Sequence, residues 1–304
     1  MFTSLRVTLV LTLGALTLPL VGATVVGASA APPQCIVSLS PTATNTLFAI
    51  GAGSQVQAVD EYSNYPAAAL ALSKRHKINA LSPSLEAILG ICKVSAHHPS
   101  TKPDLVIISY DPSDFQQKLA AQGIKVVQEN AATSVANALA QIRQIGALTG
   151  HTQRADALAA TMNRTIAAEI ASVPAHPKKR ISVFYEITYN PYYSLTSSTF
   201  VGSIMKKMGV INIADGNSTT TAAGYPELSP EYILSANPSL IFLAGDATAA
   251  SVATRPGFRN IAAVKEGNVV ELNADIASQW GPRLVDLVSQ IAREVKHVEG
   301  EPTK

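Results

Sequence analysis

Short apolar runs alternate along the first half of the chain with segments of helical period. The runs predict strands at 35–40, 57–62, 104–109 and 125–129, and a helix at 42–50 follows the first of them. Strands separated by helices form parallel sheets that are covered on both faces. The pattern therefore predicts an α/β fold.

The middle of the chain lacks strand-like runs. From 134 to 173 it is rich in Ala, Leu, Ile and Gln. Gly150 indicates the end of one helix, and a second helix is expected over 152–173, before Pro174. At 1.5 Å per residue that helix would span about 30 Å and act as a stiff connector.

The alternation of strands and helices resumes after residue 180. It predicts strands at 181–187, 240–244 and 269–272 and helices at 200–208 and 282–298, the last with Pro282 in its first turn. The chain is thus expected to comprise an N-terminal α/β lobe at 31–150, a connecting helix at 151–174 and a C-terminal α/β lobe at 175–304.

A short pattern occurs once in each half. Ser84-Leu-Glu-Ala-Ile-Leu89 aligns with Ser229-Pro-Glu-Tyr-Ile-Leu234, and each is followed by a proline-containing turn and an apolar run. The two serines suit the N-cap role. Taken alone, the repeat favours Glu86 and Glu231 as partners of the helix dipole, worth about 0.3–1 kcal/mol each, over a docking role for the two carboxylates.

The first thirty residues differ from the rest. Arg6 precedes an apolar run over 7–26, and Ala28-Ser29-Ala30 forms a small-x-small site. This predicts a signal peptide at 1–30, cleaved near Ala30, and hence a periplasmic or secreted protein; a retained membrane anchor is the alternative. Export would permit a disulfide between Cys35 and Cys92, and the sequence leaves open whether they meet.

Composition narrows the function classes. Of the 304 residues, 47 % are hydrophobic and 14 % charged, with a formal charge of +2, which indicates a globular chain without affinity for nucleic acid. Motifs for common hydrolases, metalloproteases and nucleotide-binding loops are absent. We expect no catalytic residues, no metal site and no cofactor, and we expect His97 and His98 to lie in a solvent-exposed loop.

Several stretches together resemble a known family, the periplasmic substrate-binding proteins of ABC importers for vitamin B12, ferric siderophores and haem. The first half contributes Ile36-Val-Ser-Leu-Ser-Pro-Thr-Ala-Thr44, Gly51-Ala-Gly53, Tyr62-Ser-Asn-Tyr-Pro66 and Lys102-Pro-Asp-Leu-Val-Ile107. The second half contributes 193–200, Leu228-Ser-Pro-Glu231, Arg255-Pro-Gly-Phe-Arg-Asn260, Ala263-Val-Lys265 and Gly281-Pro-Arg283. The vitamin B12 members are most similar in appearance.

The resemblance implies two Rossmann-like lobes with parallel sheets, joined by one long rigid helix, with a ligand cleft between the lobes. It implies a monomer that captures a corrinoid and delivers it to membrane permease subunits; a ferric siderophore or haem is the alternative ligand. It also implies that one glutamate per lobe, Glu86 and Glu231, docks on permease arginines, which reverses the preference drawn from the repeat alone.

Ligands of parallel-sheet folds bind beyond the carboxyl ends of the strands. The candidate ligand-binding residues there are rich in aromatic rings, which bury flat apolar area, and about half are expected to touch ligand: Ser40, Pro41, Thr42, Tyr62, Tyr110, Asp111, Tyr189, Tyr193, Tyr225, Trp280 and Arg283. Three arginines are candidates for contact with an anion: Arg255, Arg259 and Arg283.

The chain departs from the family pattern in two places, and two other functions are alternatives to ligand delivery. Residues 90–101 form an insertion relative to the family, and Gly209-Val210 replaces a familiar glycine pair. An enzyme using the cleft would have only Asp111, Asp275 and scattered serines available for catalysis. A secreted structural or adhesion module would have no small-molecule cleft.

Overall fold

The computed structural model describes residues 31–96, 98–174, 180–216 and 223–300, so the predicted signal peptide lies outside the described residues. The strands are β1 Ile36–Leu39, β2 Val56–Val59, β3 Leu105–Ile108, β4 Lys125–Gln128, β5 Ser182–Glu186, β6 Tyr192–Tyr193, β7 Ile211–Asn212, β8 Glu227–Leu228, β9 Leu240–Leu243 and β10 Val269–Glu271. The helices are α1 Pro41–Ala49, α2 Ala67–His76, α3 Leu85–Leu89, α4 Phe115–Ala120, α5 Val135–Thr149, α6 Thr152–Ala171, α7 Phe200–Lys207, α8 Pro230–Ala236, α9 Ala249–Thr254, α10 Ala262–Lys265, α11 Ala274–Ala277 and α12 Leu284–Glu299.

The first sheet is parallel and has the strand order β2-β1-β3-β4. Successive residues of β1 point into different cores: Ile36 belongs to the core shared with α5 and α6, whereas Val37 packs with Phe115 and Leu119 of α4. Burial on both faces explains why every residue of β1 and β3 is buried and why these strands lack alternation.

The second sheet repeats this construction with the parallel order β10-β9-β5-β7. Phe184 and Ile241 face one core, and Tyr185 and Phe242 face the other. A separate antiparallel pair, β6 with β8, joins Tyr192 to Leu228. The predicted α/β fold with two sets of parallel strands is confirmed.

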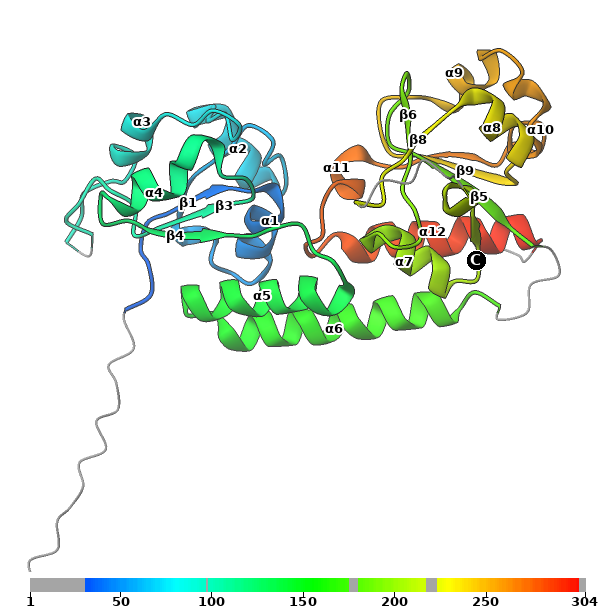
Figure 1. Ribbon diagram of the computed structural model, residues 1–304. Coiled ribbons are helices and arrows are strands. Elements are labelled where there is room, and N and C mark those ends of the chain that lie inside the picture. The colour runs from blue at the N-terminus through cyan, green and yellow to red at the C-terminus, as the bar shows by residue number, and fades with distance from the viewer. Residues whose placement is uncertain (1–30, 97, 175–179, 217–222, 301–304) are drawn as a thin grey trace, which may run out of the picture. The chain divides into compact units, whose positions relative to one another are not determined.

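Two long helices follow the first sheet in sequence. Gly150 ends α5 with a left-handed conformation (φ 78°), and α6 then runs for 20 residues beside it (Figure 1). The other end of α6 contacts α12, where Ser289 Oγ donates to Glu169 Oε1 (3.0 Å) and Lys296 Nζ to Ser172 Oγ (3.0 Å). Helix α6 therefore contacts elements from both halves of the sequence.

The last helix begins later than predicted. Its first residue is Leu284 and its N-cap is Arg283, so Pro282 lies before the helix rather than in its first turn. The amide of Leu284 donates to the carbonyl of Gly281 (2.9 Å), which makes Pro282 part of a preceding turn. Within the described residues, no helix has the length and apolar character needed to cross a membrane.

Candidate ligand-binding site

The repeated helix starts have the predicted caps. Ser84 Oγ accepts from the amide of Ala87 at the start of α3, and Ser229 Oγ accepts from that of Tyr232 at the start of α8. Glu86 and Glu231 lie in the first turns of these helices and are exposed. The dipole role and a docking role are both compatible with this geometry, because the carboxylates reach solvent.

The candidate residues of the first half gather at one edge of its sheet. Ser40, Pro41 and Thr42 follow β1, Tyr62 follows β2, and Tyr110 and Asp111 follow β3. Since β2, β1 and β3 are adjacent and parallel, their carboxyl ends meet there. The exposed fractions of Tyr62 and Tyr110 are 52 % and 57 %, so their rings are available to a ligand.

Other members of this group are engaged in local structure. Ser40 is fully buried and its Oγ accepts from the amide of Ala43, so it caps α1. Pro41 is the first residue of that helix, and Thr42 is buried at 4 % exposure. Asp111 Oδ1 accepts from the amide of Gln116 (2.8 Å). The polar groups of Ser40 and Asp111 are therefore bound to nearby backbone amides.

A cavity of about 310 Å³ brings together two predicted residues, Tyr225 and Trp280. Its walls come from both halves of the sequence: Ala131 and Ala132 from the segment after β4, and Tyr185, Leu195, Phe200, Val201 and Gln279, among others, from the second half. The lining is mostly apolar and aromatic, which suits a flat ligand. We call this hollow the aromatic cavity.

Tyr189 lines a second hollow, of about 710 Å³, beyond the ends of β5 and β9. Its ring lies under the guanidinium of Arg255, with 4.2 Å between Cζ and the ring centroid, and it contacts Tyr192 edge-on. Arg255 is only 5 % exposed and pairs with the buried Glu186. Arg255, a candidate for contact with an anion, lines this hollow, and a carboxylate of the protein is already paired with its charge.

Arg283 lines a third hollow, of about 380 Å³, with Phe48, Tyr65 and Pro66. Its Cζ lies 4.5 Å from the centroid of the Tyr65 ring, and its Nε is 3.9 Å from Asp286 Oδ2. Tyr193, in β6, is 41 % exposed. Of the eleven candidates, Tyr225 and Trp280 thus share the aromatic cavity, while Tyr189 and Arg283 line two other hollows.

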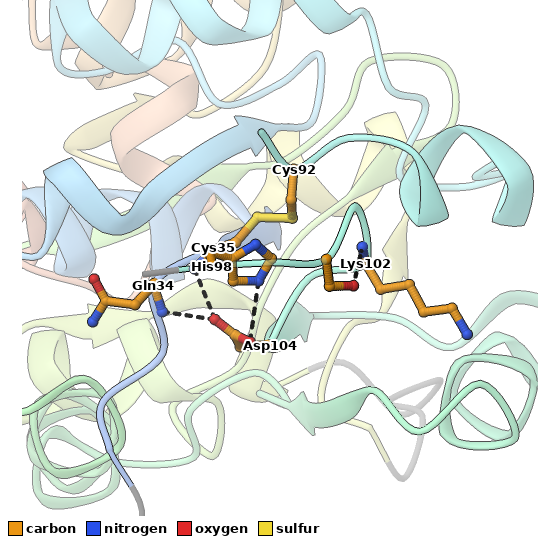
Figure 2. Close-up of a disulfide and its surroundings, with 7 residues drawn as sticks. Gln34, Cys35, Cys92, His98, Lys102 and Asp104 are labelled. Carbon is orange, nitrogen blue, oxygen red and sulfur yellow. Dashed lines mark hydrogen bonds and ion pairs between the residues drawn. A yellow bond between two sulfur atoms is a disulfide. The ribbon is translucent and has the colours of Figure 1, made fainter. Parts of the chain in front are cut away.

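The insertion is anchored by a disulfide between Cys35 and Cys92 (Figure 2). Asp104 lies beside it: one carboxylate oxygen accepts from the amides of Gln34 (2.7 Å) and Cys35 (3.0 Å), and the other is 3.2 Å from His98 Nε2. His98 is only 7 % exposed, so the expectation of a solvent-exposed loop is wrong for this residue; His97 lies outside the described residues.

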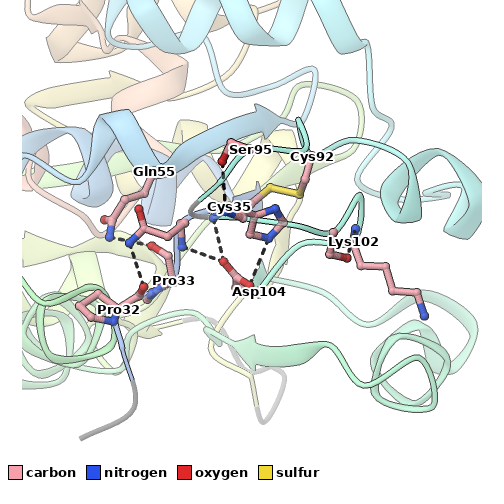
Figure 3. A network of polar contacts seen from close by, with 11 residues as sticks. Pro32, Pro33, Cys35, Gln55, Cys92, Ser95, Lys102 and Asp104 are labelled. Atoms are coloured by element: carbon pink, nitrogen blue, oxygen red, sulfur yellow. Dashed lines mark hydrogen bonds and ion pairs between the residues drawn. A yellow bond between two sulfur atoms is a disulfide. The ribbon is translucent and has the colours of Figure 1, made fainter.

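Hydrogen bonds extend this network to the start of the described chain (Figure 3). Gln55 Nε2 donates to the carbonyls of Pro33 (2.8 Å) and Thr149 (3.2 Å), and the amide of His98 donates to Ser95 Oγ (3.1 Å). Because His98 contacts Asp104, which directly precedes β3, the insertion lies against the beginning of that strand.

Several residues that shape the site escaped the sequence analysis. Glu186 ends the apolar strand β5, and an acid at the end of a buried run was a usable signal, since a buried charge requires a partner. Asn45, Gln141 and Gln279 gave no such signal. Their contacts join distant parts of the chain: Asn45 Nδ2 donates to Gln279 Oε1, and Trp280 Nε1 donates to Gln141 Oε1.

A family model for periplasmic binding proteins matches residues 36–276. The chain belongs to this family. It is 31 % identical over 273 residues to the cobalamin-binding protein of Halobacterium salinarum, an alignment that covers 86 % of this chain and 69 % of that protein. The family predicted from the sequence motifs is thereby confirmed.

Solved structures agree with this assignment. The periplasmic vitamin B12 binding protein BtuF of Vibrio cholerae superposes with a TM-score of 0.70 at 25 % identity, covering 89 % of this chain and 99 % of that one. The periplasmic heme-binding protein RhuT of Roseiflexus sp. RS-1 has a TM-score of 0.71 at 22 % identity, with 88 % and 99 % covered. The second likeness establishes the fold alone.

Proposed function

We propose that this periplasmic binding protein captures a corrinoid and delivers it to the permease of an ABC importer. The observation that carries the proposal is the aromatic cavity, where Tyr225 and Trp280 meet Ala131 and Ala132 from the other half of the sequence. Because both halves of the sequence supply lining residues, ligand affinity depends on how these segments are arranged. A delivery protein needs such a dependence in order to release its ligand.

The choice of a corrinoid rests on two supports. The relatives at 31 % and 25 % identity are named for cobalamin and vitamin B12. The candidate residues are also mainly tyrosines, whose rings offer apolar faces and whose hydroxyls can pair with the amide groups around a corrin ring. Of the arginines named for anion contact, Arg255 is paired with Glu186 and Arg283 stacks on Tyr65, which leaves Arg259 as the exposed one.

Titration with cyanocobalamin, haem and a ferric siderophore tests the ligand. Trp280 is the only tryptophan of the chain, so its fluorescence reports directly on the aromatic cavity. We expect quenching by cyanocobalamin with one site per chain in equilibrium dialysis, and a weaker response to the other two. Binding of haem or siderophore with no binding of cyanocobalamin would overturn the corrinoid assignment and leave the delivery role standing.

The docking surface consists of Glu86 on α3 and Glu231 on α8. Both are exposed acids in first helical turns, so a cation of the permease can approach them without displacing a side-chain partner from the described part of the chain. Charge pairs of this kind set orientation and association rate more than affinity. The proposal therefore predicts an effect on delivery that is separable from ligand capture.

A double variant, Glu86→Ala with Glu231→Ala, tests this role. Its affinity for cyanocobalamin should equal that of the wild type, while its stimulation of ATP hydrolysis by the liposome-embedded importer should fall severalfold and more steeply at low salt. The matched control, Glu61→Ala with Asp114→Ala, removes two exposed acids elsewhere and should stimulate normally. Equal stimulation by both double variants would exclude the docking role.

A further inference from the structure

Gln141, on α5, is hydrogen-bonded to two walls of the aromatic cavity at once. Its Nε2 donates to the carbonyl of Asn130 (2.8 Å), and its Oε1 accepts from Trp280 Nε1 (2.7 Å). Both ends of the amide are used, so each bond fixes the orientation required for the other.

The two partners belong to different parts of the chain. Asn130 directly precedes Ala131 and Ala132, which line the cavity, whereas Trp280 lies 139 residues after Gln141 and lines the cavity from the second half. Gln141 itself is not part of the lining. It contacts the wall residue Trp280 and the backbone of Asn130 without lining the cavity itself.

The bond to Trp280 restricts the largest of the aromatic rings that line the cavity. An indole has a single donor, and here that donor is committed to Gln141. A ring fixed before the ligand arrives loses less freedom on binding, which strengthens affinity without any additional contact to the ligand.

We propose that Gln141 is a positioning residue for ligand capture: it joins the 130–132 segment to Trp280 and so fixes the aromatic cavity in its binding-competent form. The effect on affinity rests on the proposed function, whereas the effect on Trp280 does not. Gln141 acts through Trp280 and the backbone of Asn130.

The variant Gln141→Leu removes both hydrogen bonds while keeping a side chain of similar size. We expect the Kd for cyanocobalamin to rise about tenfold, the effect of losing roughly one net hydrogen bond of preorganisation. Without any ligand, acrylamide should quench Trp280 more efficiently and its fluorescence anisotropy should fall. The melting temperature serves to verify that the variant is folded.

Two further variants keep the experiment decisive. Gln144→Leu changes an exposed glutamine of the same helix and should match the wild type in Kd and in fluorescence. Gln141→Glu keeps an oxygen acceptor for Trp280 and loses the donor to Asn130, so it should restore the anisotropy and part of the affinity.

The outcomes separate this proposal from the proposed function. If cyanocobalamin does not bind the wild type, the corrinoid assignment fails, and the ligand-free anisotropy of Gln141→Leu still tests the positioning role. Unchanged anisotropy and quenching in Gln141→Leu would overturn the positioning role. An equal loss of affinity in Gln144→Leu would also overturn it, because the effect would then belong to the helix as a whole.

Discussion

Arg255 and Glu186 form a two-bonded ion pair in the interior of the second half. The guanidinium donates to both carboxylate oxygens, at 2.5 and 2.9 Å, and the two side chains are 3 % and 2 % exposed. The rings of Tyr189, Tyr192 and Phe258 surround the cation. The pair thus ties the end of β5 to the segment after α9 and supports the ring of Tyr189.

Removing one partner of this pair should be costly. Glu186→Gln leaves a buried guanidinium without its counter-charge, and we expect the free energy of unfolding to fall by about 3–5 kcal/mol. Urea denaturation measures the loss. The exposed pair of Arg143 and Asp156 supplies the control, since Asp156→Asn should cost no more than about 1 kcal/mol. Equal losses in the two variants would contradict the structural role of the buried pair.

Glu129, which follows β4, gives the protein a pH-dependent stability. Its side chain is 2 % exposed, neither carboxylate oxygen has a hydrogen-bond partner among the described residues, and burial raises its pKa from 4.5 to about 8. The folded state favours the protonated acid. The contribution of Glu129 to stability is therefore present below pH 4.5 and is lost between pH 4.5 and about 8, at roughly 1.4 kcal/mol per pH unit.

The variant Glu129→Gln should remove that loss, because an amide stays neutral. Its free energy of unfolding should be close to that of the wild type at pH 4.5 and should exceed it increasingly up to pH 8. Urea titrations at pH 5, 6, 7 and 8 measure the difference. Glu61→Gln, at an exposed position, should follow the wild type throughout; a difference for Glu129→Gln that stays constant with pH would refute the prediction.

The disulfide between Cys35 and Cys92 should stabilise the first half. The two residues are 57 positions apart. Closing a loop of that length lowers the conformational entropy of the unfolded chain, which raises the free energy of unfolding by about 4 kcal/mol. Cys35→Ala with Cys92→Ala should lower the free energy of unfolding by that order. Wild-type protein kept in reductant should show the same midpoint in urea as the double variant. A midpoint equal to that of the oxidised wild type would rule out this contribution.

The sequence predicted the parallel sheets well because burial on both faces leaves a clear trace. Runs such as Leu105–Ile108 and Leu240–Leu243 are apolar throughout, and both are strands. The pair of β6 and β8 was missed, since strands of two residues have no period to detect. The capping serines were recognisable because an N-cap is a local signal, confined to one helical turn.

The details of the site depended on contacts between distant residues. Gln141 and Trp280 are 139 positions apart, and the sequence around either residue does not indicate that they are in contact. Arg255 looked available from its motif, and only the fold brings Glu186 to it across 69 positions. The same holds for His98, whose burial follows from its meeting Asp104 at the base of the insertion. Local patterns indicate which residues carry chemistry, and the tertiary fold decides which of them remain free.

The anchored insertion has a mechanical consequence. The covalent ring closed by Cys35 and Cys92 contains β1, α1, β2, α2 and α3. Under tension applied at the two ends of the chain, force passes through the sulfur bridge and bypasses these elements. The 57-residue loop would add roughly 190 Å of extension only after reduction, so single-molecule pulling with and without reductant should differ in total extension by that length.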